Sequence, residues 1–400
     1  MLNSPPIAAL EIGTTKVRVV VGESCDDGQI MITGLGETRS RGVRKAHIVD
    51  FDLAIACVRR ALELADDNGP VKINEVHLVL SGGNIQSAVS RGIVHVEDSG
   101  EILQEHVNQC MENARGMAIP AERTKMHTIC QRFYVDDHHA VHNPMGMEGS
   151  RVAVDMLLLH GIRGRMRDVV KVVREVPLEL SDVAFGGLCS ALAVLSAEQK
   201  GKGAIVIDFG GGTTDYVVYA RNAIAWAGSL AVGGDHVSND VAHGLRISSH
   251  QAEQLKEGFG SATIDYSVRS QKVAVPSDVG TTDRFVPLID LHTIIHVRIE
   301  EMLNLIREEI EAMHLMDLIG AGVVIVGGGA RLAGLEKLTS NVFGMPCSVG
   351  RPKNMSGLAA VTESPEYAAT LGMIRYGFNM AKKDEGAPGL RGLLPKIFGR

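Results

Sequence analysis

The fold of this chain is decided by the stretch Ala204-Ile-Val-Ile-Asp208-Phe-Gly-Gly-Gly212-Thr-Thr-Asp215-Tyr-Val-Val-Tyr219. It predicts an apolar β-strand that ends in an aspartate, then a glycine-rich turn, then a second apolar strand. Consecutive glycines let the backbone approach a ligand closely, and the N–H groups of such a turn can surround an anion. Asp208 could hold a hydrated magnesium ion beside that anion. The segment therefore predicts a phosphate site, and an ordinary hairpin is the alternative interpretation.

A near-copy of this segment lies close to the N-terminus, in Ala8-Ala-Leu-Glu11-Ile-Gly13-Thr14-Thr15-Lys16-Val-Arg-Val-Val-Val21. Aligning Glu11 with Asp208 superposes strand, acid, glycine, Thr-Thr pair and strand, which indicates two similar half-molecules. A third segment, Val323–Leu338, has a different form: a buried strand, the turn Gly327–Ala330, then a helix. A turn of this form can bring backbone N–H groups close to the nucleoside or its α-phosphate. Together the three segments predict a nucleotide cleft between two lobes.

Composition narrows the possible functions. With 400 residues the chain is long enough for two or more domains, and its net charge of −7 gives a nucleic-acid partner no support. No apolar run approaches the roughly 20 residues that span a bilayer. The six cysteines form no CxxC pair, so we expect reduced thiols and a cytoplasmic protein, not zinc ligands or disulfides.

Hydrophobic periodicity predicts the elements that surround the three segments. We expect a helix over 52–66, a β-α-β-β insert over 84–165, a long helix over 292–313 and a final helix over 368–376. The predicted organisation is a first lobe of residues 1–83 and 166–202, an insert of 84–165, a second lobe of 203–230 and 301–380, a largely helical insert of 231–300, a linker of 381–388, and a separate C-terminal segment of 389–400.

The three glycine-bearing segments, in this order, resemble the loops of the actin-like ATPase superfamily. Asp208–Asp215 is similar to its second phosphate loop, Glu11–Lys16 to its first, and Gly327–Ala330 to its adenosine loop. Over nearly its whole length the chain resembles FtsA, an actin-like family of bacterial cell division. That likeness is carried by Ser81-Gly-Gly-Asn-Ile85, Asn143-Pro-Met-Gly-Met147, Val232–Leu245 and Ala252–Gly260.

The resemblance implies an α/β actin-like ATPase fold, with two similar lobes around a nucleotide cleft. In the family's terms, the two lobes are subdomains 1A and 2A. The insert of 84–165 is subdomain 1C, which sets FtsA apart from actin, and the insert of 231–300 is subdomain 2B.

The resemblance also implies ATP and magnesium as ligands. Four threonines would contact the β- and γ-phosphates, Lys16 would neutralise phosphate charge, and Asp208 and Glu11 would hold Mg²⁺ through water. Glu253 and Lys256 stand one helical turn apart, so both could face the ribose. The candidate cofactor-binding residues are Glu11, Gly13, Thr14, Thr15, Lys16, Asp208, Gly210, Gly211, Gly212, Thr213, Thr214, Gly234, Glu253, Lys256, Gly327, Gly328, Gly329 and Ala330.

Two residues are candidates for positioning the hydrolytic water: Gln199, which aligns best with that site in actin-like relatives, and Asp215. An amide can orient water but is a poor general base. Glu11 also replaces the aspartate that is usual in the first loop. We therefore expect at most a slow ATPase, and primarily a nucleotide-regulated structural adaptor.

The C-terminal segment predicts a membrane contact. In Leu390-Arg-Gly-Leu-Leu-Pro-Lys-Ile-Phe-Gly-Arg400, the apolar Leu390, Leu393, Leu394, Ile397 and Phe398 share one helical face, and Arg391, Lys396 and Arg400 lie at or beyond its edges. This pattern is typical of a helix lying in an anionic membrane surface. A helix docked on the protein's own core is the alternative, and Pro395 counts against a regular helix.

The FtsA resemblance implies the partners. These are the C-terminal peptide of the tubulin-like FtsZ on subdomain 2B, copies of this chain in filaments, later division proteins through subdomain 1C, and the membrane. Arg298 matches the family's arginine for the FtsZ peptide, with a solvated helix face as the alternative. The implied location is the inner face of the cell membrane at the division site. The competing functions are an actin-like scaffold of type IV pilus assembly and a small-molecule kinase of the same superfamily.

Overall fold

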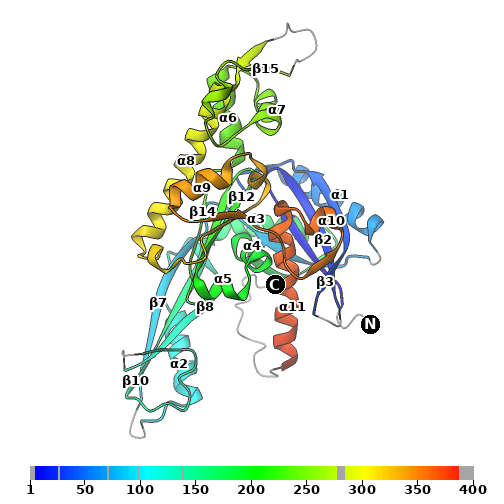
Figure 1. Cartoon of the computed structure of the whole chain (residues 1–400). Coiled ribbons are helices and arrows are strands. Elements are labelled where there is room, and N and C mark those ends of the chain that lie inside the picture. Colours follow the sequence, from blue (N-terminus) through cyan, green and yellow to red (C-terminus); the bar gives the residue numbers. More distant parts are fainter. Residues whose placement is uncertain are drawn as a thin grey trace.

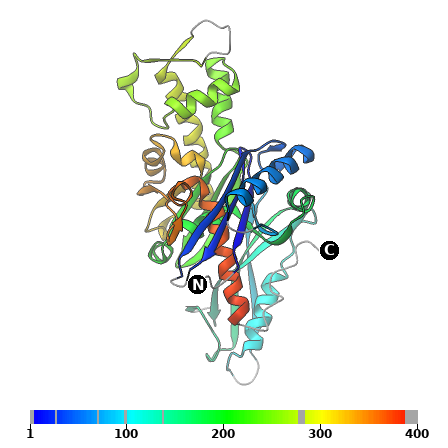
Figure 2. The ribbon, with the colours of Figure 1, turned by 90° about the vertical axis from the view of Figure 1, so that its right-hand side faces the viewer.

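The computed structural model describes residues 5–386 except 26–27, 70–71, 97–99, 137–138 and 277–283. In Figure 1 two lobes lie side by side, and one subdomain projects from each, at opposite ends of the molecule. The inserted β7–β10 subdomain is at the bottom and the α6–α8 subdomain at the top. Figure 2 shows the same elongated arrangement from the side.

The first lobe is built on a six-stranded sheet with the order β11-β6-β1-β2-β3-β19. Strands β1 and β2 form the N-terminal hairpin, and β6 and β11 add parallel strands beside β1. The strands are β1 (Ile7–Ile12), β2 (Lys16–Ser24), β3 (Ile30–Arg39), β6 (Glu75–Leu80), β11 (Glu179–Phe185) and β19 (Met355–Gly357). A short hairpin, β4 (Val43–Arg44) and β5 (His47–Ile48), follows β3.

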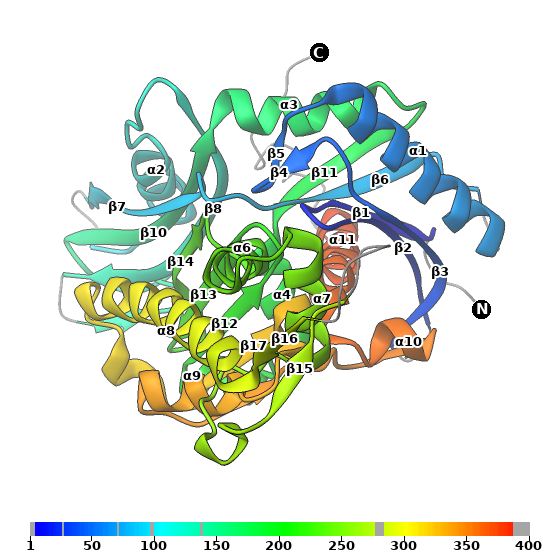
Figure 3. The ribbon, with the colours of Figure 1, turned by 90° about the horizontal axis from the view of Figure 1, so that it is seen from above.

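Helices cover both faces of this sheet. Helix α1 (Phe51–Asn68) packs on β2 and β3, and α11 (Ala368–Gly386) packs on β1, β2 and β6 from the opposite face (Figure 3). The Asp50 side chain accepts the N–H of Leu53 and so caps the start of α1. Helices α3 (Arg163–Arg174), α4 (Gly186–Val194), α5 (Ala197–Lys202) and α10 (Ala359–Thr362) complete the lobe.

The second lobe repeats the hairpin in a five-stranded sheet with the order β14-β13-β12-β17-β18. Its apolar strands are buried on both faces, as the uninterrupted hydrophobic run predicts. The strands are β12 (Ala204–Phe209), β13 (Thr214–Ala220), β14 (Ala223–Leu230), β17 (Val323–Val326) and β18 (Cys347–Val349). The short helix η3 (Gly328–Arg331) and helix α9 (Leu335–Phe343) follow β17.

The insert in the first lobe is a four-stranded antiparallel sheet with the order β7-β10-β8-β9 and one helix. Its elements are β7 (Gln86–His95), α2 (Gln104–Arg115), β8 (Arg123–Val135), β9 (His139–Val141) and β10 (Arg151–Ile162). Val107, Cys110 and Ala114 of α2 are buried and belong to a small core separate from those of the lobes.

The insert in the second lobe contains α6 (Gly234–Leu245), α7 (Ser249–Phe259), the strand pair β15 (Lys272–Ala274) and β16 (Phe285–Pro287), and the start of α8 (Leu288–Ala312). Helix α8 begins four residues before the predicted start at 292, directly after Pro287. Helix α11 continues past the predicted end at 376 as far as Gly386. Short 3₁₀ helices lie at Tyr266–Val268, Met316–Leu318 and Pro365–Tyr367.

Candidate nucleotide site

The two repeated glycine turns meet between the lobes. A Cβ added at Gly211 would overlap Thr15 Oγ1, and one added at Gly212 would overlap Thr14 Oγ1. The first turn closes on itself through Gly13 N–H, which donates to Lys16 O over 3.0 Å, and the second through Gly210 N–H, which donates to Thr213 O over 2.9 Å. Only residues without a Cβ permit this approach. Threonines and glycine N–H groups from both lobes are thereby gathered at one place.

The third glycine turn lies beside the second. Strand β17 pairs in parallel with β12, with Asp208 opposite Val326, so both strands end at the same edge of the sheet. Gly327 has φ +83°, and a Cβ there would overlap Asp208 Oδ1; a Cβ at Gly329 would lie 2.7 Å from Phe209 Cβ. Asp208 is therefore enclosed between the second and third turns.

Helices α6 and α7 continue the site into the upper subdomain. The N–H groups of Gly234 and Asp235 donate to the carbonyls of Gly210 and Gly211 over 3.0 and 2.7 Å. Lys256 Nζ donates to Gly234 O over 3.2 Å and pairs with Glu253 over 2.7 Å. The structure thus brings the Glu253–Lys256 pair, the start of α6 and the second glycine turn into one continuous surface.

Three buried carboxyl groups crowd the inner side of the turns. Burial raises the pKa of Asp208 to about 7, with Asp215 and Glu11 adding to the effect while a 2.5 Å hydrogen bond from Ser190 opposes it. Burial raises the pKa of Asp215 to about 6, although hydrogen bonds from Ser229 and Ser81 oppose the shift. Asp208 and Asp215 are cross-strand partners, so two like groups face each other in the β12–β13 hairpin.

Glu11, the counterpart of Asp208, lies opposite Arg18 in the β1–β2 hairpin. Arg18 lies 3.5 Å from Glu11 Oε2, yet among the described residues this buried oxygen has no hydrogen-bond partner. Burial raises the pKa of Glu11, and Arg18 offsets part of that rise. The site therefore contains one orphaned oxygen and three carboxyl groups whose ionised forms are destabilised.

This arrangement fits a cation held through water. Among the described residues, no three His, Cys, Asp or Glu side chains are placed to ligate a metal ion directly. A hydrated Mg²⁺ could instead receive Glu11, Asp208 and Asp215 through its water molecules, and its charge would favour their ionised forms. The water ligands would also satisfy Glu11 Oε2.

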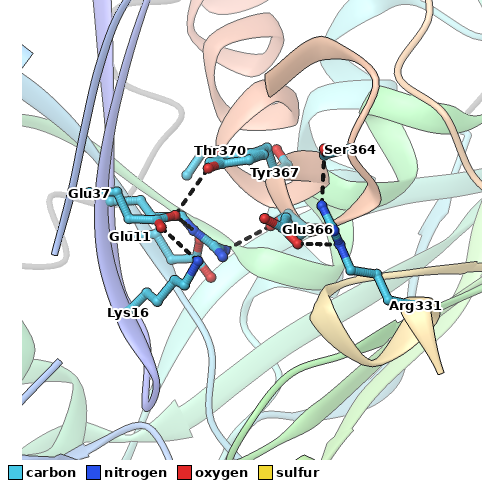
Figure 4. Close-up of polar contacts among 9 residues, drawn as sticks. Glu11, Lys16, Glu37, Arg331, Ser364, Glu366, Tyr367 and Thr370 are labelled. Carbon is cyan, nitrogen blue, oxygen red and sulfur yellow. Dashed lines mark hydrogen bonds and ion pairs between the residues drawn. The ribbon is translucent and has the colours of Figure 1, made fainter. Parts of the chain in front are cut away.

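Lys16 is engaged elsewhere. Figure 4 shows its ammonium directed at Glu37, and the Nζ–Oε1 distance is 2.6 Å. Glu37 also accepts from Arg18 Nε over 2.8 Å and from the Tyr367 hydroxyl over 3.1 Å. Arg18 in turn donates to the carbonyl of Glu366 over 2.8 Å. In this structure the Lys16 ammonium therefore belongs to a network of charged residues on the flank of the first lobe, and its contact with phosphate stays a prediction.

Gln199 is not brought to the site. It is the third residue of α5, where its side-chain oxygen accepts the N–H of Ser196 over 3.0 Å and the ammonium of Lys353 over 2.8 Å. Helix α5 leads into the first residue of β12, whereas the glycine turn follows the last, so the length of β12 separates them. Helix α4 does lie beside Asp215, since a Cβ at its first residue, Gly186, would lie 3.1 Å from Asp215 Oδ2.

Arg298 lies on α8, far along the chain from the glycine turns, and is paired on both sides. Its Nε lies 2.5 Å from Asp240 of α6 and its Nη1 lies 2.6 Å from Glu301.

The C-terminal segment 389–400 and the end of the predicted linker are outside the described residues. Among those residues no helix has the length and apolar character needed to cross a membrane.

Several residues of the site were not predicted. Ser190 and Ser229 hydrogen-bond to Asp208 and Asp215, and Ala46 of the β4–β5 turn donates its N–H to Thr14 Oγ1 over 3.0 Å. Ser190 lies in an apolar helix, where a hydroxyl is an unusual residue and could have been noticed. The β4–β5 turn carries a weaker signal, a run of basic residues at Arg41, Arg44 and Lys45 directly before a helix cap.

Solved structures define the class of fold. The PilM–PilN type IV pilus biogenesis complex superposes with a TM-score of 0.64 at 16% identity, covering 93% of this chain and 98% of that one. MreB 5 of Spiroplasma citri bound to AMPPNP gives a TM-score of 0.57 at 15% identity, covering 96% and 99%. At these identities the likeness concerns the fold alone, and it confirms the predicted actin-like α/β architecture.

Sequence comparison then defines the family. The family model of cell division protein FtsA matches residues 205–372, and the model of the SHS2 domain inserted in FtsA matches residues 82–160. The cell division protein FtsA of Pseudomonas aeruginosa is 30% identical over 380 residues, 95% of this chain and 90% of the relative. That of Escherichia coli K12 is 31% identical over 378 residues, 93% and 90%. This chain belongs to the FtsA family of cell division proteins.

Proposed function

We propose that this cell-division protein binds ATP with Mg²⁺ between its lobes, polymerises, and tethers FtsZ filaments to the inner face of the cell membrane. The nucleotide proposal rests on the contact of Thr14 and Thr15 with Gly212 and Gly211, beside three buried carboxyl groups whose pKa values are raised by burial. Phosphates held there would bind N–H and hydroxyl groups from both lobes. A ligand that touches both lobes favours their closed arrangement, which makes ATP a switch for assembly.

Slow hydrolysis is part of this proposal. The first two residues of α4, which face Asp215, are Gly186 and Gly187, and the Ser190 hydroxyl of the same helix is hydrogen-bonded to Asp208, so α4 offers no carboxylate or amide side chain to orient a water molecule. Asp215 accepts a hydrogen bond from the Ser229 hydroxyl, which occupies part of the carboxylate that would otherwise position the water. The chain would therefore act as a nucleotide-regulated adaptor more than as a turnover enzyme.

The proposed attachment to the membrane rests on the sequence of residues 389–400. A single short amphipathic helix binds membranes modestly, with each basic residue contributing about 1 kcal/mol near an anionic leaflet. Many tails linked in one polymer would bind with far greater avidity. Self-association and membrane attachment therefore support each other. FtsZ would dock on the α6–α8 subdomain, and later division proteins on the β7–β10 insert.

Co-sedimentation with anionic liposomes tests the tether. The full chain should pellet, and a truncation ending at Gly386 should stay in the supernatant. Ile397→Lys should abolish pelleting by placing a charge on the apolar face, whereas Gly399→Lys adds the same charge to the opposite face and should pellet as wild type does. Equal pelleting of the full chain and the truncation would exclude the tether. Rapid ATP turnover that depends on a small-molecule acceptor would instead favour the kinase alternative.

A further inference from the structure

The β4–β5 hairpin is tied to both phosphate turns. Ser40, which leads into it, donates its N–H to Thr15 O over 2.9 Å, and Ala46 at its tip donates to Thr14 Oγ1 over 3.0 Å. On the other side, a Cβ at Gly212 would lie 2.9 Å from Lys45 Cα. The tip of the hairpin therefore lies where the turns of the two lobes meet.

The backbone of the hairpin fixes this position. Lys45 and Ala46 have φ of +50° and +57°, the left-handed pair that a two-residue hairpin turn requires. Gly42 closes the base of the hairpin, because its carbonyl accepts the N–H groups of Val49 and Asp50 over 2.8 and 3.1 Å. Arg165 of α3 lies 2.7 Å from His47 Nε2 and braces the outer side. The hairpin is thus an ordered part of the site.

Lys45 is a cation without an assigned task. Its side chain is half-buried, and within the described part of the chain its ammonium takes part in no hydrogen bond or ion pair. Lys45 also lies near His236 of α6. Burial is the largest cause of the lowered pKa of His236, and the positive charge of Lys45 is the second. Lys16, in contrast, is held by Glu37 (Figure 4). The Lys45 ammonium is therefore available to an anion that binds where the two phosphate turns meet.

We propose that Lys45 binds the terminal phosphate of the nucleotide, reaching from the hairpin tip across the junction of the two phosphate turns. The inference rests on the proposed ATP site and names one of its residues. Lys45 lies beside Thr14 and Gly212, where the first and second turns meet. The third turn lies instead beside Asp208, on the side of the sheet where β17 pairs with β12. With the nucleoside at the third turn, Lys45 is at the γ-phosphate end. Its flexible ammonium suits a phosphate oxygen as a point charge.

Calorimetric titration of the full chain with ATP and with ADP, both with Mg²⁺, tests the proposal. Lys45→Asn removes the charge but keeps a residue that tolerates positive φ, so the hairpin should fold. The variant should lose about tenfold in ATP affinity, because a hydrogen bond to a charged group is lost, and less than twofold in ADP affinity. The control Arg41→Gln removes a charge from an exposed residue of the same segment and should change neither affinity.

The outcomes separate the two proposals. If wild type binds ATP and Lys45→Asn binds it equally well, the assignment of Lys45 is wrong and the site stands. Equal losses for ATP and ADP would also overturn the assignment, because Lys45 would then support the hairpin without touching the terminal phosphate. If wild type binds neither nucleotide, both the proposed ATP site and the assignment of Lys45 to the terminal phosphate are wrong. Partial recovery of ATP affinity in Lys45→Arg would support a charge-based contact.

Discussion

Thr14 of the first lobe and Gly212 of the second lie in direct contact, with no room for a side chain between them. A Cβ at position 212 would overlap Thr14 Oγ1 and lie 2.9 Å from Lys45 Cα. This contact makes the spacing of the two lobes depend on the absence of a side chain at one residue. A ligand that binds beside this contact therefore touches residues of both lobes.

Gly212→Ala should separate the turns and weaken ATP binding by about tenfold or more, because the added methyl group displaces Thr14 and the β4–β5 hairpin. Overpacking of this kind also lowers the free energy of unfolding by about 1–3 kcal/mol. Calorimetry and thermal unfolding measure the two effects. Gly201→Ala is the matched control, since a Cβ there has no atom within 4 Å. Normal ATP affinity in Gly212→Ala would show that the turns do not enclose the ligand.

Asp208→Asn should stabilise the nucleotide-free protein at neutral and higher pH. The folded-state pKa of Asp208 is about 7 and its ordinary value is 3.8, so the folded chain keeps a proton that the unfolded chain has released. Stability contributed by this group therefore falls as pH rises from about 4 to about 7. The melting temperature of Asp208→Asn should exceed that of wild type by an amount that grows across this range.

The same variant should lose most of the effect of Mg²⁺ on ATP affinity, because the cation no longer meets a carboxylate. Asp67→Asn changes an exposed aspartate on α1 and should leave both the melting profile and the magnesium effect as in wild type. A pH-independent difference in melting temperature between Asp208→Asn and wild type would contradict the raised pKa.

Sequence patterns located the three glycine turns and the two-lobed fold because a strand, an acid and glycines leave a local signature. They also indicated Lys16 and Gln199 as site residues, but could not predict the contacts that these two side chains make in the structure. Gln199 caps its own helix and also accepts the ammonium of Lys353, while Lys16 pairs with Glu37. Lys353 and Glu37 are distant in sequence from the residues they contact, so a local pattern does not reveal either pair. Lys45 gave only the weak signal of a basic run, because its position depends on a turn that brings it against Gly212.

Ala46→Gly should raise the free energy of unfolding by about 1 kcal/mol, because Ala46 has φ +57° and glycine adopts that conformation without steric cost. Ala56→Gly makes the same chemical change at an exposed residue of helix α1 and should lower stability by about 1 kcal/mol. Denaturant unfolding of the two variants measures both. Destabilisation by Ala46→Gly would mean that the tip does not adopt the left-handed turn.

Asp240→Asn tests whether Arg298 is available to a partner. The ion pair with Asp240 competes with any peptide for this guanidinium. If the C-terminal peptide of FtsZ binds Arg298, the variant should bind it about two- to fivefold more tightly, the range expected for release of a partly exposed pair. Arg298→Ala should weaken binding, and Glu308→Gln, elsewhere on α8, should have no effect. Unchanged peptide affinity in Asp240→Asn would indicate that Arg298 only joins α8 to α6.

The most direct test of the two-lobed site is amide hydrogen exchange of the full chain with and without Mg²⁺ and AMPPNP. A nucleotide held by both lobes should slow exchange in both turns at once, at residues 13–16 and 210–214, and also at Ala46. Slower exchange in the segments of one lobe alone, or no change in either turn, would contradict the two-lobed site.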